Sequence, residues 1–174
     1  GVTVGEIAAQ LISRRTGKDA FVGVISGLSN IDIHNANILG FRNGAAKYKF
    51  KVLQVYYTDD TYDMVYNSTE EMLKYNPEVK GIFVTTFVSK AVCDCLEKHG
   101  RDDIAVVAVD VHKDSVELLK NNKIEALIHQ NQRLQGKTAA DLAVSAASSY
   151  NNNEFKNVEI KTEIVISSNV VYYE

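Results

Sequence analysis

The sequence predicts an α/β fold in which a parallel, Rossmann-like sheet carries helices on both faces. Short apolar runs alternate with amphipathic stretches at intervals of roughly 25 residues, the rhythm of repeated strand-helix units. Most of these runs lack the alternation of a half-exposed strand, which indicates strands that are covered on both faces. Polar residues follow the runs, as expected where the carboxyl ends of parallel strands collect along one edge. A chain of 174 residues is long enough to bury a substantial core.

The first elements are a helix, a strand and a second helix. The helical spacing of apolar residues predicts a helix over 3–16 that ends at Gly17; these residues are Val4, Ile7, Ala8, Leu11 and Ile12. Residues 20–25 form an uninterrupted apolar strand, and the turn-forming stretch SGLSN follows it. A long helix is then expected over 32–48.

The same unit repeats twice in the middle of the chain. A strand over 52–57 precedes Asp59 and Asp60, which are placed to cap the next helix or to supply acids to its first turn. This helix extends to residue 75, and Pro77 helps to stop it. A strand over 81–85 and a helix to residue 99 follow, and Gly100 ends that helix.

Residues 104–136 contain the stretch on which the rest of the interpretation depends. Apolar strands over 104–109 and 124–128 stop at Asp110 and at His129-Gln130, with a short helix between them. Parallel strands end at the same edge, so Asp110 and Gln130 are expected to lie together there as ligand-binding residues. Capping is the alternative role for Asp110, but Asp114 and Ser115 already offer caps.

The rhythm changes after Gln130. Leu134, Thr138, Leu142 and Ala146 mark one stripe of a helix over 131–150. The polar stretch 151–157 reads as a loop or hinge. Apolar residues then alternate at Val158, Ile160, Ile164 and Ile166 before the sequence VVYY, and this tail reads as an edge strand or ribbon.

Composition excludes several classes of protein. The 19 basic and 22 acidic residues give a net charge of −3, and no basic cluster exceeds Arg14-Arg15, so the sequence indicates no nucleic-acid-binding face. No apolar run approaches the ~20 residues of a membrane span. Cys93 and Cys95 lie two residues apart in a helical pattern and are not expected to pair, which favours a reducing, cytosolic setting.

Enzyme motifs are largely absent from the sequence. The stretch GVISG over 23–27 is not a nucleophile elbow, because its serine is fourth rather than third. There is no dinucleotide fingerprint or phosphate loop, and the histidines show no paired metal spacing. We therefore expect no catalytic residues, no cofactor and no metal. Two alternatives stay open: His129 as a general base beside Asp110, against which ring stacking or a surface role is favoured, and an enzyme on a flavodoxin-like sheet that uses Asp59, Asp60 or His129.

The stretches AVVAVDVHKD and KNNKIEALIHQNQRLQG, with GEIAAQLI and ILGF earlier, closely resemble a known family. They are similar to the closing part of periplasmic ribose-binding-type proteins and of the sensor domain of LacI/GalR-type transcription regulators. The resemblance implies a type I periplasmic-binding-protein fold, with two α/β lobes that hold a sugar or other small effector between them. It places Asp110 and Gln130 at ligand-binding positions. Thr85 stands where the family usually has a ligand-binding asparagine and Asn37 where many members have an arginine, which implies an altered ligand or a weaker site.

The resemblance also implies how the chain is divided. Residues 2–129 with 158–174 would form the second lobe, and residues 130–157 would be a crossing segment and a helix that belongs to a largely absent first lobe. The face of that helix bearing Leu134 and Leu142 should then lack a partner, which predicts either self-association as a homodimer or repacking of the helix.

The function expected from the resemblance is that of a binding domain, not an enzyme. We expect the effector-binding domain of a bacterial LacI/GalR-type transcription regulator, cytoplasmic, that binds a sugar-like small molecule. It would contact DNA only through an absent N-terminal domain and would not contact a membrane. The alternative is the periplasmic or extracytoplasmic solute-binding protein of a sugar ABC transporter.

Overall fold

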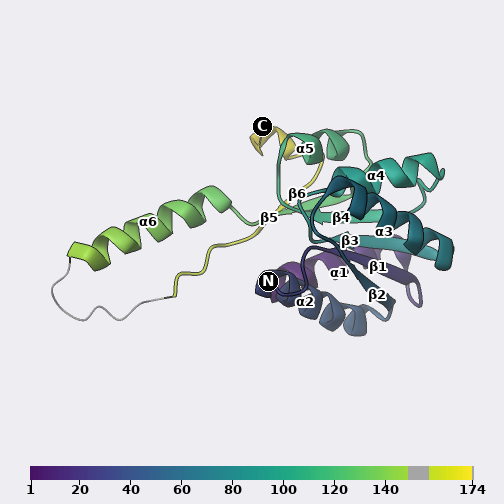
Figure 1. The fold of residues 1–174 in the computed structure, drawn as a ribbon, viewed down its shortest axis with the longest axis horizontal. Helices are drawn as coiled ribbons and strands as arrows, with labels where there is room; N and C mark the ends of the chain where they lie inside the picture. Colours follow the sequence, from purple (N-terminus) through teal and green to yellow (C-terminus); the bar gives the residue numbers. More distant parts are fainter. Residues whose placement is uncertain (149–156, 174) are drawn as a thin grey trace.

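The computed structural model describes residues 1–148 and 157–173, and the predicted alternation of strands and helices is confirmed there (Figure 1). In chain order the elements are α1 (Val2–Thr16), β1 (Phe21–Ser26), α2 (Asp32–Tyr48), β2 (Lys51–Tyr57), α3 (Tyr62–Tyr75), β3 (Val79–Val84), α4 (Ser89–Lys98), β4 (Ala105–Val109), α5 (Lys113–Lys120), β5 (Ala126–His129), α6 (Gln132–Ser148), β6 (Glu163–Val165) and the 3-10 helix η1 (Val170–Tyr173). The last two residues of the helix predicted over 131–150, and residues 151–156 of the predicted polar loop, lie outside the described residues.

The sheet has the strand order β2-β1-β3-β4-β5-β6. Each pair among the first five strands is parallel, and β6 runs antiparallel to β5 with His129 opposite Glu163. The predicted α/β fold class, a parallel sheet with helices on both faces, is therefore confirmed. All five parallel strands end at the same edge, and polar side chains follow them there.

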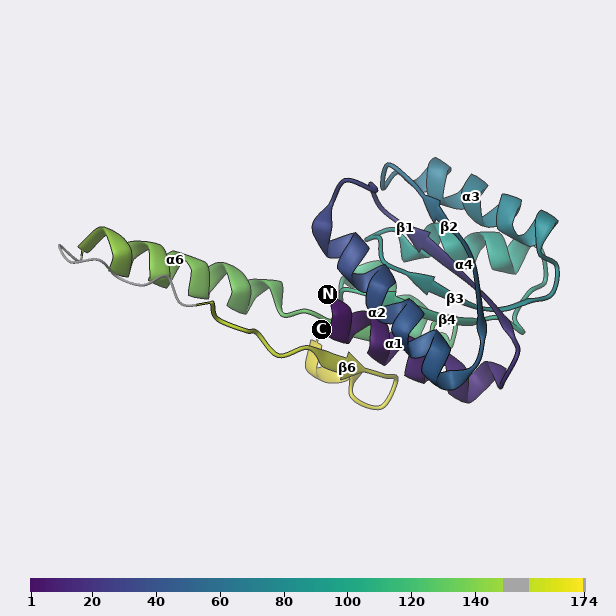
Figure 2. The ribbon, with the colours of Figure 1, turned by 90° about the horizontal axis from the view of Figure 1, so that it is seen from below.

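Helices cover both faces of the sheet, as Figures 1 and 2 show. Helices α1 and α2 pack on one face, where Phe41 of α2 stacks on Phe83 of β3 with 4.9 Å between ring centroids. Helices α3, α4 and α5 pack on the other face around the buried side chains of Met72 and Ile82. The uninterrupted apolar strands follow from this arrangement, since both faces of the central strands are removed from water.

Helices α1 and α2 approach each other unusually closely because glycines lie at their contact. A Cβ atom at Gly40 would lie 1.9 Å from the carbonyl oxygen of Val2, and one at Gly5 would lie 2.0 Å from the carbonyl oxygen of Asn37. No side chain fits in this space, so the backbones themselves are in contact. This close approach removes the inner face of α2 from solvent.

The helix after β2 begins two residues later than Asp59 and Asp60 suggested. Thr61 is its N-cap, with an extended backbone, and the Thr61 hydroxyl accepts a hydrogen bond from the amide of Met64 at 3.4 Å. Asp59 instead accepts hydrogen bonds from the amide and hydroxyl of Thr61. The prediction that Asp59 or Asp60 caps this helix is therefore wrong, because Thr61 is the residue directly before the first helical turn.

The tail forms a shorter edge strand than the alternation predicted. Only Glu163–Val165 pairs with β5, and the buried residue is Val165, which is 0% exposed, rather than Ile164 or Ile166, which are each 41% exposed. The alternation gave the wrong phase because pairing with β5 sets which face of β6 meets the core. The sequence VVYY forms the 3-10 helix η1 and not a strand.

Candidate functional site

Asp110 and Gln130 follow neighbouring strands, β4 and β5, and their side chains meet at the carboxyl edge of the sheet. The amide Nε2 of Gln130 donates a hydrogen bond to Oδ1 of Asp110 at 3.2 Å. Asp110 has a left-handed backbone, with φ of +67°, and its amide donates to the carbonyl of Ile128 at 3.0 Å. The strand pairing thus continues by one bond while the chain turns, which directs the carboxylate away from the sheet.

A second amide reaches the same carboxylate from the start of α6. Gln132 Nε2 donates to Oδ1 of Asp110, the oxygen that Gln130 also contacts. Asn131 between the two glutamines is left-handed, with φ of +55°. Asparagine and aspartate adopt this conformation more readily than most residues, so the chain reverses direction here at small cost. Oδ2 of Asp110 takes part in neither of these bonds.

Asp110 does not serve as the cap of α5. The hydroxyl of Ser115, inside the first turn, accepts a hydrogen bond from the amide of His112 at 3.0 Å and lies 3.0 Å from the His112 carbonyl. Ser115 is fully buried. Ser115 therefore supplies the side-chain hydrogen bond at the start of α5, and the Asp110 carboxylate is not needed as a cap.

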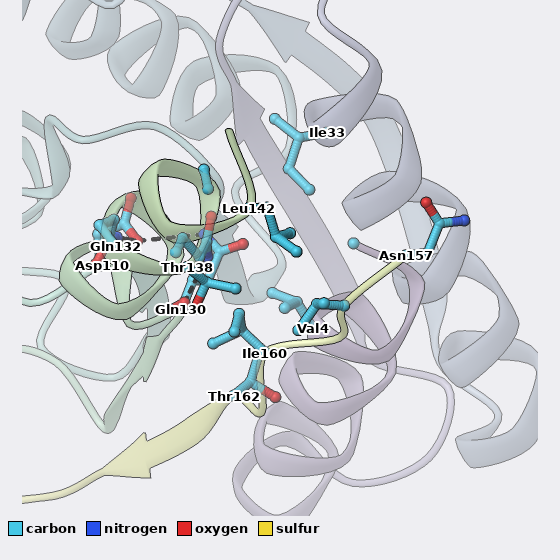
Figure 3. Close-up of a pocket in the computed structure, with 14 residues that line it drawn as sticks. Val4, Ile33, Asp110, Gln130, Gln132, Thr138, Leu142, Asn157, Ile160 and Thr162 are labelled. Carbon is cyan, nitrogen blue, oxygen red and sulfur yellow. Dashed lines mark hydrogen bonds between the residues drawn. The ribbon is translucent and has the colours of Figure 1, made fainter. Parts of the chain in front are cut away.

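The pair lies in the wall of a cavity of about 660 Å³ bordered by α6, by the first residues of α1 and α2, and by the segment before β6. Figure 3 shows the polar groups of Asp110, Gln130 and Gln132 gathered at one end of it, away from the apolar side chain of Ile33. Several separate stretches of chain border this space, and besides Ile33 and Asp110 the residues that line it include Gly1 and Val4, Gln130 and Gln132, and Asn157, Val158, Ile160 and Thr162. A cavity of this size, partly apolar with a few converging polar groups, has the character of a small-molecule site.

Thr85 is not in this wall. It follows β3, the strand next to β4, and belongs to a hydrogen-bonded network there. Its hydroxyl is 2.8 Å from that of Ser26 and 3.2 Å from Nδ1 of His34. Thr85 is 3% exposed, whereas His34 in the first turn of α2 is partly exposed. Thr85 therefore reaches the edge of the sheet through His34, which the sequence analysis did not select. A polar residue in the first turn of a helix that follows a strand is the signal that could have found it.

Asn37 lies deeper than its predicted role requires. It is 1% exposed, and its Oδ1 has no hydrogen-bond partner among the described residues. The close contact of α1 with α2 at Gly5 accounts for this burial. The structure thus brings Asp110 and Gln130 together in the cavity wall and leaves Asn37 and Thr85 outside it.

His129 follows β5 but does not contact Asp110 by any hydrogen bond seen in residues 1–148 and 157–173. Its ring lies edge-on to that of Tyr173, with 5.4 Å between centroids, and this ring contact is the favoured alternative to a general base. Cys93 is 3% exposed, and burial raises the pKa of its thiol to about 12. A thiol of that pKa is protonated at neutral pH and a poor nucleophile, so the structure favours a buried structural role.

The described residues contain no group of three or more side chains suited to holding a metal ion. No helix in the described part of the chain is long and apolar enough to cross a membrane.

The chemistry that this edge offers is recognition of hydroxyl groups. A carboxylate accepts hydrogen bonds, a primary amide both donates and accepts, and a hydroxyl does either. Asp110, Gln130 and Gln132 supply these groups within one cavity wall. A ligand hydroxyl that replaced one of the glutamine amides would form a charge-assisted bond with Asp110.

Comparison with known proteins places this geometry in a family. The sequence profile described as "Periplasmic binding protein domain" matches residues 2–151. The ribose import binding protein RbsB of Bacillus subtilis is 26% identical over 140 residues, which cover 80% of this chain and 45% of that protein. The Escherichia coli protein of the same name is 25% identical over 127 residues, 72% of this chain and 43% of its own length. The matched part of the chain therefore spans less than half the length of these relatives.

Solved structures agree with this match. The solute-binding protein of an ABC transporter from Burkholderia graminis, in complex with D-arabinose, superposes with a TM-score of 0.92 at 25% identity, over 99% of this chain and 61% of that one. The periplasmic solute-binding protein from Actinobacillus succinogenes with bound D-allose gives a TM-score of 0.88 at 20% identity, over 99% and 60% of the two chains. At 20% identity, the second similarity is evidence for the fold alone.

Proposed function

Since the chain belongs to the periplasmic binding protein domain family, we propose that it forms one lobe of a domain that binds a small sugar-like molecule. The observation that carries the proposal is the Asp110 carboxylate, held by Gln130 in the wall of a cavity at the carboxyl edge of the sheet. A buried or half-buried carboxylate with amide partners and no capping role is suited to accept ligand hydroxyls.

The four predicted ligand residues take different positions in this proposal. Asp110 and Gln130 contact hydroxyls directly, which their place in the cavity wall supports. Thr85 acts from beneath the ligand by holding His34, since its hydroxyl is 3.2 Å from that ring. Asn37 stays a prediction, supported by a buried Oδ1 that has no partner among the described residues.

The division of the chain into lobes is part of the proposal. Residues 2–129 with 158–174 form the second lobe, and residues 130–157 cross to the first lobe and return. The lack of any buried residue in the described part of α6 supports this division, because a helix that packs on its own lobe would bury one face. The match to the relatives also fits, since the aligned residues cover 45% and 43% of their lengths.

The relatives favour a solute-binding protein of a sugar ABC transporter, working outside the cytoplasm. The proteins of B. subtilis and E. coli are both named ribose import binding proteins. A binding lobe at 25–26% identity supports this class of function without fixing the sugar. The ligand in this proposal is therefore a small polyhydroxylated molecule, and ribose is one candidate.

The effector-binding domain of a cytoplasmic LacI/GalR-type regulator is the second candidate. The observation that favours it is that Cys93 and Cys95 are both unpaired, as is usual in a reducing compartment. The gene sequence upstream of Gly1 separates the two candidates: a helix-turn-helix favours the regulator, and a signal or lipoprotein peptide favours the transporter. Fractionation of cells into cytosol and periplasm gives an independent answer.

The test is ligand binding by the protein expressed from its natural start to its natural end. Thermal unfolding and calorimetric titration would be measured against pentoses, hexoses, polyols and nucleosides. A ligand at ~100 times its dissociation constant adds about 2.7 kcal/mol to the free energy of unfolding. Asp110→Asn keeps the shape but removes the charge, and we expect it to weaken binding roughly 10- to 100-fold, the range for a lost charge-assisted hydrogen bond.

Asp114→Asn is the matched control, because Asp114 is an exposed carboxyl four residues further on that lies outside the cavity wall. We expect Asp114→Asn to bind as the wild type does. If no molecule of the panel binds, the sugar-binding proposal is wrong. If a molecule binds equally well to wild type and Asp110→Asn, the binding function stands and the site is elsewhere.

A further inference from the structure

We propose that Gln132, the first residue of α6, competes with the ligand for the Asp110 carboxylate and so lowers the affinity of the site. The amide Nε2 of Gln132 donates a hydrogen bond to Oδ1 of Asp110. A ligand hydroxyl that binds this oxygen must therefore displace the Gln132 amide. The inference rests on the proposed function and adds a residue that sets how tightly the ligand binds.

Oδ1 of Asp110 accepts hydrogen bonds from two side-chain amides at once. Gln130 Nε2 donates to it at 3.2 Å, and Gln132 Nε2 is the second donor. A carboxylate oxygen has two lone pairs, so these two donors use its capacity to accept. A third donor, such as a ligand hydroxyl, can form a good hydrogen bond to Oδ1 only if one of the two amides leaves.

The two glutamines differ in how firmly they are held. Gln130 is half-buried directly after β5, and its backbone carbonyl accepts a hydrogen bond from Nε2 of Gln135 at 2.5 Å. Gln132 is exposed, so water can replace Asp110 as the partner of its amide. Releasing an exposed amide into water costs little, whereas releasing a half-buried amide leaves it short of a partner. We therefore expect the ligand to displace Gln132 and to retain Gln130.

The contact between Gln132 and Asp110 lies where a ligand would bind. Both residues line the cavity of about 660 Å³, and Figure 3 shows their side chains together at its polar end. Oδ2 of Asp110 takes part in neither amide bond, so a single ligand hydroxyl can use Oδ2 without competition. Two neighbouring hydroxyls of one sugar would take both carboxylate oxygens. Gln132 therefore opposes the ligands that Asp110 would otherwise hold with two hydrogen bonds.

Release of Gln132 leaves the start of α6 intact. Oδ1 of Asn131 accepts a hydrogen bond from the amide of Leu134 at 3.2 Å, and the carbonyl of Asn131 accepts one from the amide of Gln135 at 3.0 Å. Neither bond involves Gln132, so the helix keeps its first turn when the Gln132 side chain turns away. The bond that is lost is the one that ties α6 to Asp110, the residue after β4. A ligand that breaks this bond favours the released state of α6, which couples ligand binding to the position of α6.

The test is a titration of the full protein with D-ribose and with D-glucose, in the wild type and in two variants of Gln132. Gln132→Met keeps roughly the length of the side chain and a high helix propensity but removes the N–H donor, and Gln132→Ala removes the whole amide. We expect both variants to bind sugar about three- to tenfold more tightly than the wild type, since the affinity rises by the fraction of time for which the contact blocked the site. Lys137→Ala is the matched control, because Lys137 is exposed on α6 and outside the cavity wall, and it should bind as the wild type does.

Nuclear magnetic resonance of the side-chain amides gives a second readout that needs no ligand. The signal of the Gln132 amide is identified by its absence in Gln132→Met. Asp110→Gly removes the carboxylate and tolerates the left-handed backbone at this position, where φ is +67°. We expect the Gln132 signal to move in Asp110→Gly towards that of a hydrated amide. D-ribose added to the wild type should move it in the same direction.

The outcomes distinguish this inference from the proposed function on which it rests. If the wild type and both Gln132 variants bind sugar equally well, the competition is wrong and the sugar site stands. If only Gln132→Ala binds more tightly, the size of the side chain is the cause and the inference is also wrong. An unchanged Gln132 signal in Asp110→Gly would overturn the inference whether or not a sugar binds. If neither the wild type nor Gln132→Met binds either sugar, both proposals fall together.

Discussion

The lobe and helix α6 differ in what they do with their apolar side chains. The lobe buries apolar side chains on both faces of the sheet, and the described part of α6 buries none. Leu127 in β5 is 0% exposed, whereas Leu142 in α6 is 44% exposed. The two leucines lie in one chain only 15 residues apart in sequence, yet one is part of a core and the other is not.

This difference shows that residues of the lobe complete their own core without α6. Figure 2 shows α6 projecting from one edge of the lobe, joined to it by the segment after β5 and by the segment that returns to β6. A helix with an apolar stripe and no core of its own is built to pack on something else. The comparison therefore supports assigning α6 to another lobe of the same protein or to a second copy of the chain.

The largest expected effect is that of truncating a leucine in the lobe. Leu127→Ala should lower the free energy of unfolding by about 2–5 kcal/mol, because it leaves a cavity in the core between β5 and the helices on that face of the sheet. Leu142→Ala should change it by about 0.5 kcal/mol at most, since that side chain is already half exposed. Urea unfolding at two protein concentrations is the measurement.

An equal loss in both leucine variants would contradict the comparison. It would mean that the α6 stripe is covered in solution. If the loss at Leu142 also depends on protein concentration, a second copy is the cover, and the predicted homodimer is supported. Analytical ultracentrifugation of the two variants would then show a monomer only for Leu142→Ala.

Adding a methyl group to a glycine should destabilise the α1–α2 contact but not α6. Gly40→Ala places Cβ against the carbonyl oxygen of Val2, so α1 and α2 must move apart, at a cost of about 1–3 kcal/mol. In α6, a Cβ at Gly136 meets no atom within 4 Å. Gly136→Ala should therefore not destabilise the protein and should raise its helical circular dichroism. A destabilised Gly136→Ala variant would indicate a partner packed against α6.

A smaller effect is expected from the ion pairs of Asp103. Its carboxylate accepts from Arg101 Nε and from Lys80 Nζ, each at 2.8 Å, and these bonds hold the pKa of Asp103 well below its usual value. The folded state therefore prefers the charged form, and the stabilisation is present above the usual aspartate pKa of ~4 and is lost as pH falls through the lowered value.

Asp103→Asn should lower the free energy of unfolding by about 0.5–1 kcal/mol at pH 7, a figure reduced for solvent screening because Asp103 is 43% exposed. The difference from wild type should narrow steadily below about pH 4. Asp141→Asn in α6 is the control, and it should change the free energy of unfolding by no more than about 0.5 kcal/mol, both at pH 7 and below about pH 4. A constant difference across pH would show that the charge is not the cause.

Removing α6 altogether is expected to leave the rest of the chain folded. β5 and β6 are antiparallel with His129 opposite Glu163, so the ends at Gln130 and Thr162 are close enough for a tight turn. Replacing residues 131–161 by Asn-Gly should give a folded lobe within about 1 kcal/mol of the original. An unfolded product would show that α6 supports the lobe, and the division into lobes would then be wrong.

The sequence alone determined the elements of the lobe and the polar residues at its edge. Uninterrupted apolar strands and amphipathic helices are local patterns, and Asp110 and Gln130 could be paired because parallel strands end at one edge. The capping of α3 was missed because Thr61 competes with Asp59 at the same turn. The phase of β6 was missed because alternation does not say which face will meet a core.

Only the tertiary structure decided which of these residues share a site. The strand order places Phe87 against His112 and separates Thr85 from Asp110, and no pattern within one strand specifies that order. Asn37 is buried because glycines let two helices approach, which depends on Gly5, 32 residues earlier in the chain. Local sequence patterns indicate which face of each segment is buried and which is exposed, whereas a site depends on contacts between segments far apart in sequence.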